Sequence, residues 1–259
     1  MNKPKISIIL PSIGPNKWEG LYEQIQKSVG PYSFEVIAVG PYFPPKELES
    51  KGRFKFVRDF GCVSRCLQIG LLVAEGELIT WLPDDCMIFE KAYEETISFF
   101  EKKERKDGIT ILYSEGPNFS GNQHVDFKYW ICGTHPDLRL KSVNPSWQIA
   151  PIFMYRTDYF RELGGLDCSF EHVNMNTHDL AFRVQNSGGT MFHSPCRVFA
   201  SDWKPWGVPK GPIQRAYEEN DLPRFQKLYG GEDNPLQRKV ELDNWKNAEP
   251  IWSKRFKAE

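Results

Sequence analysis

The sequence predicts an α/β fold: a mainly parallel sheet flanked by helices. Three observations support this prediction. Over residues 5–100, short apolar runs typical of buried strands alternate with segments whose apolar residues recur at helical spacing. Proline or glycine follows most of the strand-like runs directly, which ends each strand at a defined point. The chain has 259 residues, of which 40% are hydrophobic, and this is enough to fill one core.

The predicted elements follow one another in the order expected for strand-helix-strand units. In the first part we expect strands at 5–10, 34–39, 54–57 and 77–82, and helices at 18–29, 64–74 and 93–100. Residues 114–147 are predicted to be rich in loops. In the second part we expect strands at 148–155, 190–193 and 197–200, and helices at 157–163, 179–184 and from about 221.

Composition excludes several classes of protein. The formal net charge of −1 argues against a nucleic-acid binder, because such proteins carry a strong basic excess. No apolar run approaches the roughly 20 residues of a transmembrane helix, and the first apolar run meets Pro11 too early for a signal peptide. The six cysteines form no C-x-x-C pair, so we expect mostly reduced, buried thiols and a cytoplasmic location.

An acidic pair marks the expected ligand site. Ligands of parallel α/β sheets bind beyond the carboxyl ends of the strands. Here those ends are Pro11-Ser12, Gly40-Pro41 and Asp84-Asp85. Neighbouring carboxylates suit Mg²⁺ or Mn²⁺, which commonly link one or two carboxylates to substrate phosphates. The alternative is a solvated Pro-Asp-Asp turn that caps the next helix.

Taken together, several segments resemble the inverting glycosyltransferases of the GT-A fold, and most closely their large family 2. The first half contains a strand followed by Pro-Ser, then FEVIAVG, then Gly61-x-x-Ser64 with Gln68-x-Gly70, and then AEGELITWLPDDC. Further on, GGLD at 164–167 and HDLAFR at 178–183 resemble the acceptor-side segment of that family. The resemblance covers roughly residues 5–200.

The resemblance implies a fold with a nucleotide-sugar-binding half at 1–113, an acceptor-binding half at 114–205 and a C-terminal extension at 206–259. It also implies a UDP- or GDP-type sugar donor, a glycan or other hydroxyl acceptor, and Mn²⁺ or Mg²⁺. By resemblance, Asp85 and His193 would bind the metal, and Asp179 would be the catalytic base. The donor would be held by these residues: Pro11, Ser12, Gly40, Ser64 and Asp84.

The chain departs from the family pattern at four positions. Gly40 replaces an acidic residue, Gln68 the usual asparagine, and Pro83 the first aspartate of the metal motif. In one register Thr177 replaces the usual base. These departures favour an alternative, a degenerate relative that binds a nucleotide sugar or glycan without turnover. A nucleotidyltransferase is a second alternative, although residues 11–17 form a poor triphosphate loop.

Individual residues also have plainer interpretations. Asp179 and Arg183 are spaced i, i+4 and could form an ordinary helical ion pair. A lone histidine such as His193 is more often structural than metal-binding. Aromatic rings in loops are candidates for an acceptor wall, with core packing as the alternative; they are Trp130, Trp147, Trp203 and Trp206.

Overall fold

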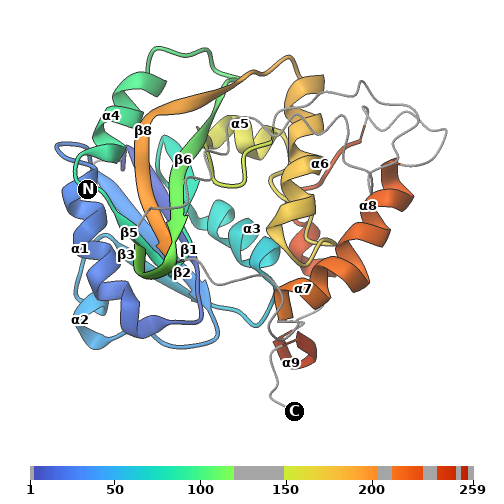
Figure 1. Ribbon diagram of the computed structural model, residues 1–259, viewed down its shortest axis with the longest axis horizontal. Helices are drawn as coiled ribbons and strands as arrows, with labels where there is room; N and C mark the ends of the chain where they lie inside the picture. Colours follow the sequence, from blue (N-terminus) through green and yellow to red (C-terminus); the bar gives the residue numbers. More distant parts are fainter. Residues whose placement is uncertain (1–2, 120–148, 203–211, 230–237, 249–251, 256–259) are drawn as a thin grey trace.

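An eight-stranded mixed sheet with helices on both faces forms the body of the protein (Figure 1). The computed structural model describes residues 3–119, 149–202, 212–229, 238–248 and 252–255. The strand order is β3-β2-β1-β4-β7-β6-β8-β5. The strands are β1 (Ile6–Pro11), β2 (Phe34–Gly40), β3 (Phe54–Arg58), β4 (Leu78–Trp81), β5 (Cys86–Ile88), β6 (Gly108–Gly116), β7 (Phe153–Arg156) and β8 (Met191–Asp202).

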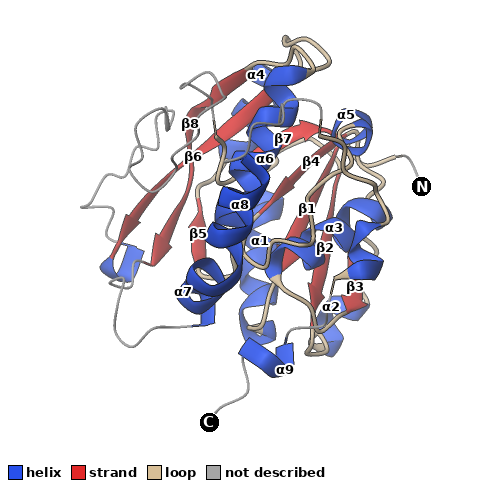
Figure 2. Cartoon of the chain, turned by 90° about the vertical axis from the view of Figure 1, so that its right-hand side faces the viewer, coloured by secondary structure: helices blue, strands red, loops and turns tan. Residues whose placement is uncertain are grey.

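The helices divide between the two faces of the sheet. Helices α1 and α4 contact each other, and they pack on β5 and β8 respectively, whereas α3 packs on β1 and β2 and contacts α6 (Figure 1). Helix α8 packs against α6 (Figure 2). The α-helices are α1 (Trp18–Ser28), α2 (Lys46–Glu49), α3 (Val63–Val73), α4 (Ala92–Phe100), α5 (Thr157–Glu162), α6 (Val173–Asn186), α7 (Pro212–Ala216), α8 (Leu222–Tyr229) and α9 (Trp252–Arg255).

The amino-terminal half confirms the predicted alternation of strands and helices. Strands β1 to β4 are mutually parallel, and β1 and β2 are almost completely buried, as their continuous apolar sequences require. Helix α1 buries Trp18, Leu21 and Ile25 along one stripe against the sheet. The carboxyl ends of β1, β2 and β4 therefore meet at one edge.

The second half differs from the prediction in its strands. Strand β6 was not predicted: we expected no strand at 108–113 and a loop from residue 114. The two predicted strands at 190–193 and 197–200 are one long strand, β8, which pairs in parallel with β6. Strand β7 is antiparallel to β4 and β6, and β5 is antiparallel to β8, so the sheet is mixed.

Two hydrophobic clusters hold the described residues together. The larger one fills both faces of the sheet. The smaller one joins α6 to α8 through Phe182, Phe225 and Tyr229. Cys62, Cys66, Cys86 and Cys168 are buried, as predicted, and Cys196 is partly buried.

Some sequence predictions fall on residues outside the described ranges. These are Cys132, Trp130, Trp147, Trp203 and Trp206. Within the described ranges, no helix combines the length and the apolar character needed to cross a membrane.

Candidate active site

A compact hydrogen-bonded group occupies the carboxyl edge of the parallel strands. The Ser12 hydroxyl, just after β1, donates to Asp84 Oδ2 at 2.5 Å. The same oxygen of Ser12 accepts from the Trp18 indole N–H at 2.5 Å and from the Gly14 N–H at 3.1 Å. Gly14 N–H also donates to Asp84 Oδ2 at 2.9 Å. The side chains that follow β1 and β4 are therefore fixed to one another before any ligand arrives.

Gly40 explains one departure from the family pattern. It ends β2 and lies beside the chain that leaves β1, where Pro11 pairs with Val39 and Ser12 N–H donates to the Val39 carbonyl at 3.1 Å. A Cβ atom at position 40 would stand 2.1 Å from the Ser12 carbonyl oxygen. No side chain fits there without a shift of the backbone. An acidic residue at this position is therefore incompatible with the observed packing.

Asp85 lies next to two acidic residues that the sequence analysis did not single out. The Asp202 N–H, at the end of β8, donates to the Asp85 carbonyl at 3.1 Å. Glu115, on β6, pairs in register with Ser201 of β8. Burial, together with the negative charge of Asp85, raises the pKa of Glu115. The edge of the sheet thus brings together several acidic residues, and the Asp202 carboxylate accepts from Asn118 N–H at 2.9 Å.

This donor set suits a hard divalent cation. Carboxylate oxygens are the ligands that Mg²⁺ and Mn²⁺ prefer, and a bound cation would relieve the repulsion between Asp85 and Glu115. No three His, Cys, Asp or Glu side chains among the described residues form a closed metal cage. An ion held by one or two carboxylates and completed by substrate phosphates fits this arrangement.

Glu115 and Asp202 were missed because each depends on long-range strand pairing. Strand β6 was not predicted over residues 108–113, and the predicted strand at 197–200 ended before Asp202. The run Ile109-Thr110-Ile111-Leu112-Tyr113, rich in β-branched residues and lying between two glycines, was the available signal for β6.

Ser64 is not exposed at this edge of the sheet. It lies in the first turn of α3 and is fully buried. The Cys168 thiol contacts the Ser64 carbonyl oxygen at 3.9 Å. Of the predicted donor-binding residues, the structure thus brings together Pro11, Ser12, Gly40 and Asp84, with Asp85 adjacent, and leaves Ser64 within the core.

Asp179 lies in a buried ion-pair network on α6. Its carboxylate accepts from Arg183 Nε at 3.0 Å and from the Tyr229 hydroxyl at 2.5 Å. Arg238 bonds to the carboxylates of both Asp179 and Asp167. The side chain of Asp179 is fully buried. Its oxygens are thus already occupied by cations and a phenol, which realises the ion-pair interpretation of the i, i+4 spacing.

Asp167 is the second carboxylate of this network. Burial acts to raise the pKa of Asp167. The positive charge of the Arg238 guanidinium outweighs this effect and holds the pKa below its usual value. The network therefore keeps the GGLD segment and α6 in contact with the C-terminal part of the chain. Gln68 reinforces the same turn, donating to the Gly164 carbonyl at 3.0 Å and accepting from Leu166 N–H at 2.8 Å.

His193 is separated from the acidic edge along the sheet. It pairs with Thr110 near the start of β6, whereas Ser201 pairs with Glu115 near the end. The stretch of β6 between Thr110 and Glu115 spans about 16 Å. His193 and Asp85 consequently do not meet around one ion in this structure.

Comparisons with known proteins bear on the fold. The sequence matches no protein-family model and no curated protein. Several solved structures are nevertheless similar in fold. The structure of GalNAc-T7 with UDP, GalNAc and Mn²⁺ has a TM-score of 0.60 at 15% identity. It matches 95% of this chain, and the chain spans 56% of GalNAc-T7.

A second similar structure is that of residues 1–349 of S. aureus TarS in complex with UDP. It has a TM-score of 0.57 at 15% identity, and the match covers 89% of this chain and 67% of that one. Another structure of S. aureus TarS, of a longer chain, has a TM-score of 0.55 at 15% identity, and the match covers 41% of that chain. The fold is that of the GT-A glycosyltransferases. The predicted fold class is thereby confirmed, including a single domain with a sheet flanked by helices.

Proposed function

We propose that this protein is a glycosyltransferase that moves a sugar from a nucleotide-diphosphate donor to a hydroxyl acceptor. The observation that carries the proposal is the hydrogen-bonded group of Ser12, Gly14 and Asp84 at the carboxyl edge of β1 and β4, with Asp85 next in the chain. Ligands of such sheets bind at this edge. Two structures with the same fold contain UDP, and one of them also contains Mn²⁺, so we favour a UDP donor over a GDP donor.

The chain's own residues provide the positioning. Ser12 and the Gly14 N–H fix Asp84 Oδ2, which leaves the other carboxylate oxygen without these two bonds. Asp85, with Asp84, would hold Mn²⁺ or Mg²⁺ against the diphosphate. Such an ion acts as a Lewis acid that stabilises the negative charge of the leaving nucleotide. Inversion at the sugar carbon rests on the resemblance to family 2.

Transfer to a hydroxyl also needs a group that accepts its proton. The resemblance assigns this role to Asp179, and the assignment stays a prediction. In the described structure the Asp179 carboxylate is shared by Arg183, Arg238 and Tyr229. These contacts favour a second candidate function, in which the protein binds a nucleotide sugar without turnover.

Thermal denaturation with UDP, GDP and Mn²⁺ tests the donor site. Ligand at 100 times its Kd stabilises the native state by about 2.7 kcal/mol, which corresponds to a rise in Tm of about 5–10 °C for a chain of this size. We expect UDP with Mn²⁺ to give such a rise. Absence of any shift with every nucleotide diphosphate would refute the donor site.

A hydrolysis screen across common UDP-sugars then separates the two candidate functions. Release of UDP, accelerated by Mn²⁺, supports a transferase. Binding of UDP-sugars with no release of UDP, alone or with a panel of glycan acceptors, supports the binding-only relative.

A further inference from the structure

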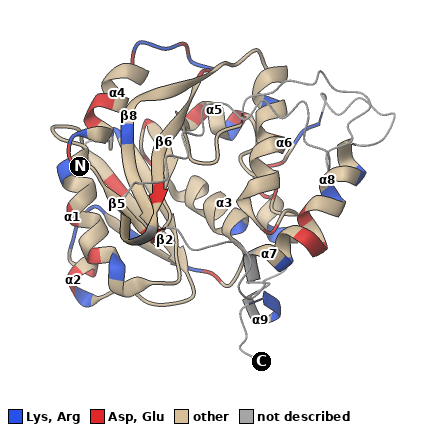
Figure 3. Ribbon diagram, viewed as in Figure 1, with Lys and Arg blue, Asp and Glu red and all other residues tan. Residues whose placement is uncertain are grey.

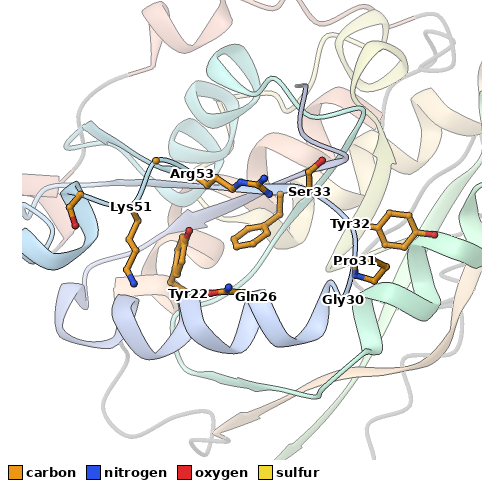
Figure 4. A pocket seen from close by; sticks show the side chains of 11 residues that line it. Tyr22, Gln26, Gly30, Pro31, Tyr32, Ser33, Lys51 and Arg53 are labelled. Carbon is orange, nitrogen blue, oxygen red and sulfur yellow. The ribbon is translucent and has the colours of Figure 1, made fainter. Parts of the chain in front are cut away.

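Figure 4 shows a cavity of about 630 Å³. It lies at the start of β2, the end of the strand opposite to the acidic edge. Its walls come from α1, from residues 30–34 before and at the start of β2, and from residues 50–53 before β3. Strand β2, from Phe34 to Gly40, separates the cavity from the acidic edge by about 20 Å. A ligand in this cavity would therefore be a different molecule, or a different part of one, from the nucleotide.

The charges that line this cavity are all positive. Lys51 and Arg53 contribute the cations, and the lining contains no aspartate or glutamate. Neither cation forms an ion pair with a carboxylate of the described residues; each lies instead over an aromatic ring. Lys51 and Arg53 are thus held by ring contacts and not by ion pairs within the part of the chain that the structure describes.

A second cavity, of about 470 Å³, provides a contrast. It is also lined by arginines, but they are already engaged. Arg105 pairs with Asp158 and Glu162, and Arg161 donates to the carbonyls of Leu71 and Ala74. The arginines of that cavity are therefore held by carboxylates or carbonyls, whereas Lys51 and Arg53 contact only aromatic rings among the described side chains.

The two cations lie over two aromatic rings that pack against each other. Lys51 Nζ is 5.8 Å from the centre of the Tyr22 ring, and Arg53 Cζ is 5.7 Å from that of Phe34. The two rings are 5.4 Å apart and buried in the core. Stacking of this kind restrains the long side chains of Lys51 and Arg53. The apolar rings beneath them strengthen the attraction between these cations and an anion. Both effects favour binding of a negative group at this place.

A further donor is available in the same cavity. Gln26 extends from α1 beside Tyr22 (Figure 4), and its amide makes no hydrogen bond with any residue that the structure describes. An ammonium, a guanidinium fork and an amide together provide the donors that phosphate oxygens accept. The cavity is far larger than a phosphate ion and has the volume typical of small-molecule sites.

We propose that this cavity binds a phosphate ester of a small hydroxylated molecule, such as a sugar phosphate, through Lys51, Arg53 and Gln26. This site goes beyond the proposed transfer reaction and does not depend on it. The positive charges of Lys51 and Arg53 would attract the phosphate, and the rest of the ligand would fill the space towards Pro31 and Gln26. Binding weakens as salt concentration rises, because exposed cations are screened.

Calorimetric titration with glucose 6-phosphate tests the proposal, with glucose and inorganic phosphate as separate arms. We expect saturable binding of the ester, weaker binding of phosphate and none of glucose. The variant K51Q/R53Q should weaken ester binding at least tenfold. K46Q/K102Q is the matched control, since it removes the same charge from exposed lysines outside the cavity and should leave the affinity unchanged.

Three results would overturn the proposal. The first is absence of ester binding at millimolar concentration, and the second is equal weakening in the control variant. The third is inorganic phosphate binding as tightly as the ester, which would exclude a site built for an ester. UDP affinity, measured on the same variants, should stay unchanged, so failure of the donor site and failure of this site are distinguishable.

Discussion

Arg183 depends on Asp179 for its charge partner inside the protein. Both side chains are buried, and their closest oxygen and nitrogen are 2.9 Å apart. Removal of one partner from a buried pair leaves an uncompensated charge, which typically costs about 3–5 kcal/mol. We therefore expect D179A to lower the free energy of unfolding by about this amount, measured by urea denaturation.

The control for D179A is D158A. Asp158 pairs with Arg105 on the surface, where both side chains are about half exposed, and such pairs contribute about 1 kcal/mol or less. If Asp179 acted only as a catalytic base, D179A would be as stable as D158A. That outcome would contradict the structural role assigned here.

A second prediction at the level of single residues concerns Gly40. The clash of a Cβ with the Ser12 carbonyl forces the two strand ends apart. Overpacking of this kind costs about 1–3 kcal/mol. We expect G40A to lower Tm and to weaken UDP binding, because Ser12 positions Asp84.

The matched control is G20A. A Cβ at Gly20 meets nothing within 4 Å, and alanine in a helix is favoured over glycine by up to about 1 kcal/mol. G20A should therefore raise Tm slightly and leave UDP binding unchanged. Unaltered stability and UDP affinity in G40A would refute the explanation that close packing excludes an acidic side chain at position 40.

At this scale the sequence predicts the local contacts better than the distant ones. The convergence of Ser12, Gly40 and Asp84 follows from parallel strands whose carboxyl ends share an edge. The partners of Asp179 do not follow in this way. Arg183 is one turn away along the helix, but Tyr229 and Arg238 come from the C-terminal part of the chain, and local pattern does not indicate such contacts.

At the scale of elements, two titratable groups with opposite effects meet at the start of α6: His172, its N-cap, and Asp221, the last residue of the helical turn at 217–221. Asp221 accepts the backbone N–H groups of Glu171 and His172, each at 2.7 Å, and burial raises its pKa to about 6. Burial lowers the pKa of His172 to about 4. His172 is also the N-cap of α6, where its side chain accepts from Asn174 N–H.

The signs of the two contributions follow from proton binding. Between about pH 4 and 6, native Asp221 binds more protons than unfolded Asp221, so its contribution to stability falls as pH rises. Between about pH 4 and 6.5, native His172 binds fewer protons than unfolded His172, so its contribution rises with pH. In the wild type the two trends offset each other.

Variants separate the two trends. Relative to wild type, D221N should gain stability with rising pH over about pH 4–6, and H172Q should lose stability with rising pH over about pH 4–6.5. Urea denaturation at each pH measures both slopes. Parallel profiles for wild type and both variants would contradict the assigned titrations.

The elements themselves were predictable where their patterns are local. Strands β1 and β2 and helices α1 and α3 have continuous or periodic apolar sequences, and all four were predicted. Strand β5 has only three residues, and β6 finds all its partners in β7 and β8, far along the chain. Short strands and long-range pairing leave little signal in the sequence; the missed Glu115 lies in β6, and the missed Asp202 ends β8, the partner of both β5 and β6.

At the scale of the whole molecule, the C-terminal segment joins the two halves of the fold. Arg65 of α3 binds Asp59 and donates to the carbonyls of Trp245 and Ala248 at 2.8 and 2.6 Å. Gln68 donates to the Leu242 carbonyl at 2.9 Å. The described part of the C-terminal extension is therefore packed against α3 and the GGLD turn.

Charges of both signs occur on the helices in the view of Figure 3, as expected from the net charge of −1. The two proposed sites have opposite signs. The acidic edge of the sheet suits a cation with a diphosphate, and the Lys51–Arg53 cavity suits an anion.

The metal-dependent affinity for UDP, measured by calorimetry on wild type and D85N, tests the central claim most directly. We predict that Mn²⁺ strengthens UDP binding to the wild type at least tenfold and has no such effect on D85N, while both proteins have the same Tm without ligand. An equal increase in UDP affinity in both proteins, or a wild-type UDP affinity that does not change with Mn²⁺, would contradict the account.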